Sequence, residues 1–158
     1  GLGAIGRRVA EIARAFGAKV IYYSASGAPA QEGYEQVDFE TLLTQSDIIS
    51  VHAPLNEHTE GLINSKAFEK MKSSCIFLNL GRGPIVDEQA LYNALVRNQI
   101  AAAGLDVLCK EPMSADNPLL KIKDSKHLLI TPHIAWASVE ARTHLMEIIH
   151  GQVKDFFA

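Results

Sequence analysis

The stretch Gly1-Leu2-Gly3-Ala4-Ile5-Gly6 begins the sequence with the pattern GxGxxG. This pattern suggests which fold the rest of the chain should form. Three glycines ahead of a helix allow a tight turn, a close approach of a pyrophosphate to the backbone, and close packing of the helix on a sheet. The N-terminus of the helix then favours a negative charge. The pattern alone also fits an ordinary glycine-rich turn, so the dinucleotide interpretation depends on the elements that come after it.

The glycine pattern requires a β-strand immediately before it, and the sequence starts at the first glycine. We therefore expect the first strand of the fold to be missing from this chain. Its absence would leave a slot in the sheet, with unpaired backbone groups and an uncovered apolar face.

Helical and extended patterns alternate along the rest of the chain. Apolar residues recur at helical spacing up to Phe16, and Gly17 follows as a left-handed cap. Further helices are predicted over 38–45, over 65–72, after Asp87 and from about Ser138, the first three capped by Asp38, Ser65 and Asp87. Short apolar runs predict strands over 19–23, 48–52, 75–80, 101–108 and 128–131.

This alternation predicts the fold class. Nearly continuous apolar strands separated by helices are typical of a parallel sheet covered on both faces, so we predict a Rossmann-type, doubly wound α/β fold. The length of 158 residues fits a single domain over 1–158.

Composition excludes several classes of function. The net charge is −3 and no cluster of Lys and Arg occurs, which argues against a nucleic-acid surface. The apolar stretches are too short to span a bilayer, so no membrane segment is predicted. Cys75 and Cys109 form no CxxC pair, which favours a reducing cytoplasm over a disulfide framework. No metal site is predicted, because Glu140, His144, Glu147 and His150 lack a metal-binding spacing.

Polar residues that could bind a ligand or take part in catalysis follow the predicted strands, at the edge where parallel α/β sheets bind ligands. Arg82 lies between two glycines and could hold a carboxylate with two hydrogen bonds. Asp106 lies in an apolar run, where a carboxylate needs partners. Glu111 and His133 follow neighbouring strands, and a paired carboxylate holds a histidine protonated near neutral pH. Each residue alone could be structural, but their shared location favours a site.

The segments together resemble the NAD-binding domain of the D-isomer-specific 2-hydroxyacid dehydrogenases. The resemblance covers essentially the whole chain and rests on GLGAIG at Gly1, HAPLNEHTEGLIN at His52, FLNLGRGPIVDEQAL at Phe77, GLDVLCKEP at Gly104, NPLL at Asn117 and TPHIAW at Thr131. NLGRG and HIAW resemble the glycerate dehydrogenase (hydroxypyruvate reductase) branch. The resemblance implies an enzyme that transfers a hydride between NAD and a 2-keto acid/D-2-hydroxy acid pair, here hydroxypyruvate/D-glycerate.

The resemblance also implies roles for individual residues. Arg82 would bind the substrate carboxylate and carbonyl, His133 would be the acid/base, and Glu111 would tune His133. Members usually dimerise through this domain, and they carry a separate substrate domain that is absent here. The implied cofactor contacts come from the residues that follow the predicted strands: Gly1, Gly3, Ala4, Ile5, Gly6, Ser24, Ala53, Pro54, Leu80, Gly81, Arg82, Asp106, His133, Ala135 and Trp136.

One position departs from the simplest NAD pattern. The acid expected about 20 residues after the glycines is absent, and Ser24 stands there. Because no carboxylate repels a 2′-phosphate, some use of NADP is expected beside NAD.

Two other classes of function stay open from the sequence. A non-catalytic NAD(H)-sensing co-repressor of the same superfamily would also bind the cofactor, but it needs no arginine, glutamate and histidine at the site. A methyltransferase has a similar glycine-rich turn but leaves Arg82, Glu111 and His133 without a role.

Overall fold

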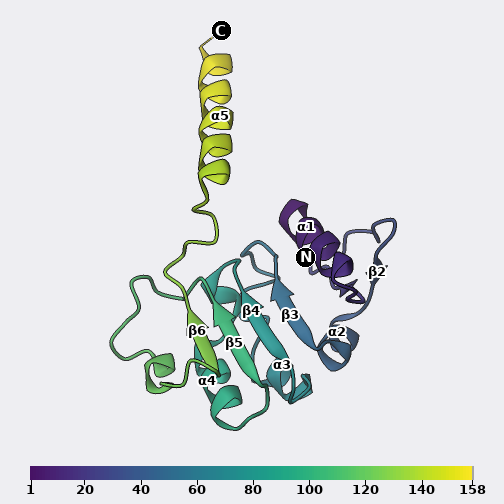
Figure 1. The fold of residues 1–158 in the computed structure, drawn as a ribbon, viewed down its shortest axis with the longest axis vertical. Coiled ribbons are helices and arrows are strands. Elements are labelled where there is room, and N and C mark those ends of the chain that lie inside the picture. The colour runs from purple at the N-terminus through teal and green to yellow at the C-terminus, as the bar shows by residue number, and fades with distance from the viewer. Residues whose placement is uncertain (158) are drawn as a thin grey trace.

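The computed structural model describes residues 1–157, and helices and strands alternate along them (Figure 1). The predicted elements all occur, and their bounds differ from the predicted ones mainly at the ends. In chain order the elements are α1 Ala4–Ala15, β1 Ile21–Tyr22, β2 Glu35–Gln36, α2 Phe39–Gln45, β3 Ile48–Val51, α3 Ser65–Lys70, β4 Ile76–Asn79, the 3₁₀ helix η1 Gly83–Ile85, α4 Glu88–Val96, β5 Ala102–Leu105, the 3₁₀ helix η2 Pro118–Lys121, β6 Leu128–Ile130 and α5 Val139–Phe156.

All strand pairs among the described residues are parallel, as the alternation predicts. β3, β4, β5 and β6 form one sheet in that order, and β1 pairs with β2 in a second, two-stranded sheet. A cavity of about 650 Å³ lies between the two sheets, and α1, β1, α2 and β3 contribute to its lining. The parallel α/β class is therefore confirmed.

The core lies on one face of the four-stranded sheet. Ile49, Phe77, Ala103 and Leu128 stand side by side across the four strands, and all are buried. Buried residues of α2, α3 and α4 pack on this row, and the rings of Phe68 and Phe77 meet edge to face at 5.6 Å. Burial of these aliphatic and aromatic side chains is the main source of stability in this part of the chain.

The opposite face of the sheet differs from the prediction. Residues that alternate with this row point to the other face, and Ile48, Ile76 and Leu129 among them are exposed, so within residues 1–157 the sheet is covered by helices mainly on one face. The apolar stripe predicted on α1 is also exposed, because α1 buries Gly6 and Ala10 instead. α5 has no buried residue and stands away from the body of the molecule (Figure 1).

Two local predictions need correction. Ser65 does not cap α3; it is the first helical residue, and the side chain of Asn64 accepts hydrogen bonds from the N–H groups of Lys66 and Ala67. Strand β2 lies outside the predicted strands, because its two residues, Glu35 and Gln36, are polar. The caps by Asp38 and Asp87 are confirmed. Within residues 1–157, no helix combines the length and the apolar character needed to cross a membrane.

Candidate active site and cofactor site

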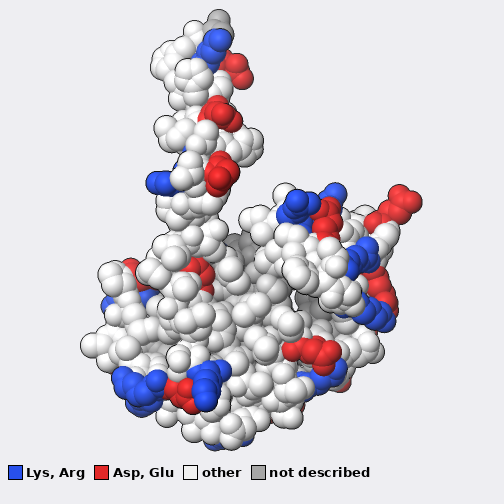
Figure 2. All heavy atoms as spheres, viewed as in Figure 1, with Lys and Arg blue, Asp and Glu red and all other residues white. Residues whose placement is uncertain are grey.

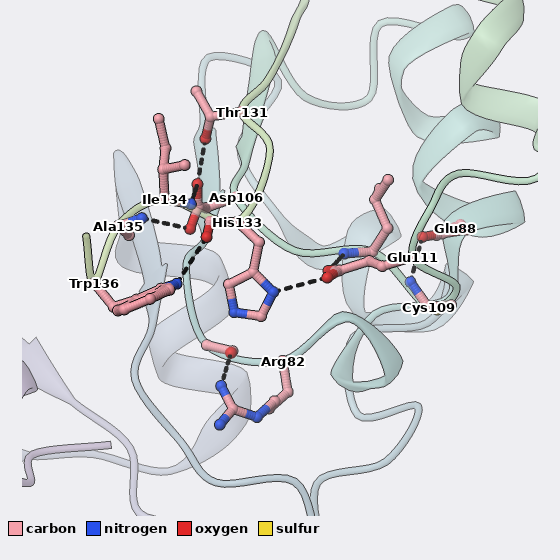
Figure 3. Close-up of polar contacts among 12 residues, drawn as sticks. Arg82, Glu88, Asp106, Cys109, Glu111, Thr131, His133, Ile134, Ala135 and Trp136 are labelled. Carbon is pink, nitrogen blue, oxygen red and sulfur yellow. Dashed lines mark hydrogen bonds and ion pairs between the residues drawn. The ribbon is translucent and has the colours of Figure 1, made fainter.

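The residues predicted to carry chemistry meet at the carboxyl edge of the four-stranded sheet. Arg82 follows β4, Glu111 lies in the loop after β5, and His133 follows β6. Figure 3 shows the imidazole of His133 between the carboxylate of Glu111 and the guanidinium of Arg82. Positions far apart in the sequence thus form one cluster, because parallel strands end at the same edge.

His133 and Glu111 form a direct pair. Nδ1 of His133 lies 2.7 Å from Oε2 of Glu111, and Oε1 of the same carboxylate accepts the N–H of Leu108 at 2.9 Å. The hydrogen bond with His133 and the one from Leu108 lower the pKa of Glu111 below its ordinary value. Nε2 of His133 has no hydrogen-bond partner among residues 1–157, so this ring nitrogen is available to a ligand.

Asp106 fixes the backbone that carries His133. It is only 4 % exposed, and its carboxylate accepts the hydroxyl of Thr131 at 2.5 Å and the N–H groups of Ile134 and Ala135 at 2.9 and 2.8 Å. Burial alone would raise the pKa of Asp106, but these hydrogen bonds lower it below its ordinary value. The expected need for partners is therefore met by the loop, and a contact of Asp106 with the cofactor stays a prediction.

His133 itself has an unusual backbone. Its φ of 55° lies in the left-handed region, which a residue with a Cβ adopts at a cost. The indole Nε1 of Trp136 donates to the carbonyl of His133 at 2.9 Å and supports this turn (Figure 3). Trp136 is 54 % exposed, which leaves part of its ring free to line a site.

The loop with Arg82 is held by a residue that sequence reasoning missed. Asn79 is buried, its amide nitrogen donates to the carbonyl of Arg82 at 3.0 Å, and its oxygen accepts the N–H of Gly81 at 3.1 Å. A polar residue at the end of an apolar strand is the one signal that could have found it. The guanidinium of Arg82 is exposed, and its only hydrogen bond within residues 1–157 goes to the carbonyl of Gly81, so it can turn to an anion.

The glycine-rich turn fits a dinucleotide phosphate. A Cβ on Gly6 would lie 2.3 Å from the carbonyl of Gly1, and one on Gly1 would lie 2.7 Å from the carbonyl of His52, so both glycines are required by packing. A Cβ on Gly3 would meet nothing within 4 Å, so the helix N-terminus is open at that residue. No side chain caps α1 and no acid lies in its first turn, which leaves its N–H groups to bind an anion.

The other predicted cofactor residues begin α1 or follow strands of the two sheets. Ala4 and Ile5 form the first turn of α1, Ser24 follows β1, and its hydroxyl lies 3.1 Å from that of Ser26. Ile5, Leu80 and Trp136 expose apolar surface that can pack on flat rings. Ala53 and Pro54 follow β3, Leu80 and Gly81 follow β4, and Ala135 follows β6. No cofactor contact is tested by this geometry, so each assignment stays a prediction.

Neither cysteine side chain forms a described hydrogen bond with Arg82, Glu111 or His133. Burial and the nearby Glu88 carboxylate raise the pKa of Cys109 to about 11, so its thiol is not a ready nucleophile. Among residues 1–157, no group of three or more His, Cys, Asp or Glu side chains is arranged to hold a metal ion. Figure 2 shows basic and acidic side chains interspersed on the visible face.

Comparison with known proteins shows the family of the chain. The chain is 45 % identical over 158 residues to a hydroxypyruvate reductase of Blautia hydrogenotrophica, covering 99 % of the chain and 48 % of that protein. It is 41 % identical over 152 residues to a glyoxylate reductase of Korarchaeum cryptofilum, covering 94 % and 45 %. The chain therefore spans about half the length of the curated relatives it matches.

A solved structure agrees with these relatives. The fold superposes with a TM-score of 0.90 and 32 % identity on a D-lactate dehydrogenase of Aquifex aeolicus complexed with NAD and lactic acid, and the match covers 99 % of the chain and 51 % of the other protein. Residues 1–135 match the family D-isomer specific 2-hydroxyacid dehydrogenase, NAD binding domain. The chain thus belongs to the D-isomer specific 2-hydroxyacid dehydrogenases, of which it contains the NAD-binding domain.

Proposed function

We propose that the full-length protein reduces a 2-keto acid to a D-2-hydroxy acid, with hydroxypyruvate and D-glycerate as the pair. The observation that carries this proposal is the His133–Glu111 pair, whose second imidazole nitrogen is free within the described residues and lies on the side of Arg82. An acid/base next to a carboxylate-binding arginine is what reduction of a 2-keto acid requires.

Each residue has one task in this reaction. Arg82 holds the substrate carboxylate and polarises the neighbouring carbonyl through its planar fork. His133 donates the proton on Nε2 to the carbonyl oxygen as negative charge develops there, and Glu111 stabilises the imidazolium before this transfer. NADH, when bound, supplies the hydride to the carbonyl carbon. In the reverse direction, neutral His133 accepts the hydroxyl proton.

The N-terminal edge of the site would hold the cofactor. The open face at Gly3 and the uncapped N-terminus of α1 suit the pyrophosphate, and Ser24 suits the adenosine ribose. The apolar surfaces of Ile5 and Trp136 are available to its rings. These residues favour NADH as the main cofactor and leave some use of NADPH, because Ser24 supplies no repulsive charge.

The choice of hydroxypyruvate rests on the 45 % identical relative named hydroxypyruvate reductase, while other relatives are named glyoxylate reductase. A screen of the full-length protein with hydroxypyruvate, glyoxylate, pyruvate and phenylpyruvate, using NADH and NADPH, tests it. We expect the highest kcat/KM with hydroxypyruvate and NADH. A higher kcat/KM with glyoxylate would reject the substrate assignment but keep the reaction.

The variant His133→Ala separates an enzyme from a co-repressor that only senses NAD(H). Proton transfer by a positioned side chain contributes about 10²- to 10⁴-fold, so kcat should fall by that range while NADH binding, followed by cofactor fluorescence, persists. Binding of NADH by the wild type without turnover of any of the four keto acids would favour the sensor.

Assembly and location follow as part of the same proposal. We infer a homodimer formed through this domain, supported by the exposed apolar side chains of α5 and of the uncovered sheet face. Light scattering on the full-length protein should give twice the monomer mass, and a monomer at micromolar concentration would reject the dimer. A cytoplasmic location is supported by Cys75 and Cys109, which are both free thiols.

A further inference from the structure

Glu88, the first residue of α4, contacts both ends of the segment between β5 and η2. Its Oε1 accepts the backbone N–H of Cys109 at 2.8 Å, and its Oε2 accepts the side-chain amide of Asn117 at 2.8 Å. Asn117 is buried, and its own oxygen accepts the N–H of Leu119 at 2.9 Å. A single carboxylate thus ties the start and the end of the segment 109–117 to the helix that follows the Arg82 loop.

The same segment is packed directly against the Arg82 loop. A Cβ on Gly83 would lie 2.0 Å from the carbonyl of Leu108 and 2.5 Å from the nitrogen of Cys109, so the two backbones are in contact. Sγ of Cys109 also lies 3.5 Å from the carbonyl oxygen of Val86, the residue that follows η1. Leu108 in turn donates to Glu111, which pairs with His133.

These contacts form a continuous chain from α4 to the imidazole. Glu88 fixes Cys109, the neighbouring Leu108 fixes the carboxylate of Glu111, and Glu111 fixes Nδ1 of His133. Because hydrogen bonds to a carboxylate are stronger than those between neutral groups, the first link is a firm one. Glu88 touches neither the imidazole nor the guanidinium within the described hydrogen bonds, so it can act only through the loop.

We propose that Glu88 is a positioning residue for the acid/base pair: its carboxylate, through Cys109 and Asn117, holds Glu111 beside His133 and in register with Arg82. This inference rests on the proposed function for its kinetic consequence. Its structural part, the hold on segment 109–117, does not depend on any reaction.

The test is a set of variants of the full-length protein. Glu88→Gln keeps an oxygen for Cys109 but presents an amide N–H to the amide N–H of Asn117. Asn117→Asp places a second carboxylate against Glu88. The double variant E88Q/N117D restores the pattern with reversed polarity, because the introduced amide can donate to the introduced carboxylate, whose other oxygen still accepts from Leu119. Glu69→Gln, on an exposed turn of α3, is a control that removes the same charge as Glu88→Gln.

Two readouts are followed. Hydrogen exchange by mass spectrometry reports on the peptide that contains 107–112, and the pH profile of keto-acid reduction reports on the pair. Each single variant should speed hydrogen exchange in this peptide and move the alkaline limb of the pH profile to lower pH. It should also lower kcat roughly 3- to 30-fold, which is less than the ~10²- to 10⁴-fold loss expected when the acid/base itself is removed. The double variant should recover both readouts, and the control should match the wild type.

The outcomes separate the two proposals. A wild type that reduces no keto acid rejects the proposed function, while the exchange experiment still tests Glu88. Unchanged exchange and an unchanged pH profile in both single variants would overturn the role of Glu88. If the single variants fail to fold, an E88Q/N117D variant that folds with wild-type exchange and kcat supports the pairing, and one that recovers neither rejects it.

Discussion

The variant Glu111→Gln tests the acid/base pair through the pH dependence of reduction. The introduced amide keeps an oxygen for the N–H of Leu108, so the loop retains that hydrogen bond, but its N–H faces Nδ1 of His133. This arrangement removes the negative charge and favours the neutral imidazole. Because the reaction needs a protonated His133, the alkaline limb of the kcat/KM profile should move to lower pH.

The size of this movement follows from the geometry. At 2.7 Å, two unit charges attract by ~6 kcal/mol at an effective dielectric constant of ~20. The side chains of His133 and Glu111 are 41 % and 38 % exposed, so water screens the pair and about 1 kcal/mol is a reasonable net value. That energy corresponds to about 0.7 pH unit. The hydrogen bond with His133 is also the first cause of the lowered pKa of Glu111.

The assay is the initial rate of keto-acid reduction by the full-length protein between pH 5 and 10, with NADH consumption followed by absorbance. Glu57→Gln is the matched control, because Glu57 contacts His58 at 3.6 Å in an exposed pair and shares no described hydrogen bond with Arg82, Glu111 or His133, so its profile should equal the wild-type profile. An alkaline limb that stays within 0.2 pH unit of the wild type in Glu111→Gln, a criterion set well below the expected ~0.7 unit, would refute the pairing as the source of the proton donor.

Three further predictions concern other parts of the site. Arg82→Lys should raise KM for the keto acid and lower kcat, because an ammonium cannot form the bidentate fork, and steady-state kinetics would contradict this if KM stayed unchanged. Ser24→Asp should lower kcat/KM for NADPH more than for NADH, since a carboxylate repels the 2′-phosphate; a wild-type preference for NADPH would contradict the cofactor assignment. Asp106→Asn should cost about 2–4 kcal/mol of stability, because the amide nitrogen would replace one of the two carboxylate oxygens and face the backbone N–H that this oxygen accepts. Since the pKa of Asp106 is lowered on folding, its stabilisation is present above the ordinary value of 3.8 and is lost as pH falls through the lower folded value. Urea unfolding of the wild type and the variant should therefore differ most near neutral pH and converge in acid.

The order of the elements can be predicted because it depends on local patterns. Apolar runs such as 75–80 and caps such as Asp87 are recognised within a few residues, and the structure places both as expected. Strand β2 cannot be found in this way, since Glu35 and Gln36 are polar and pair with β1 through the backbone. The exposed apolar stripe of α1 shows a second limit of prediction from sequence. Helical periodicity indicates which residues share a face, but it does not show whether another element covers that face.

The cluster of Arg82, Glu111 and His133 is predictable for a different reason. Once the sheet is known to be parallel, residues after successive strands must lie at one edge, and the structure brings these three there. Sequence order alone predicts neither the 2.7 Å contact of His133 with Glu111 nor the left-handed φ of His133.

The residues that hold this cluster in place are not predictable from local patterns, because their partners are distant in sequence and mostly backbone groups. Asp106 accepts N–H groups 28 and 29 residues away, and Glu88 accepts an N–H 21 residues away. A backbone donor carries no signature in the sequence, so only the fold reveals which carboxylate it meets. Each of these carboxylates holds a loop that begins at the end of a neighbouring strand. The geometry of an acid/base pair assembled from separate loops therefore depends on such anchors as much as on the reacting side chains, and substitutions at Asp106 and Glu88 should disturb catalysis by loosening the loops that carry His133 and Glu111.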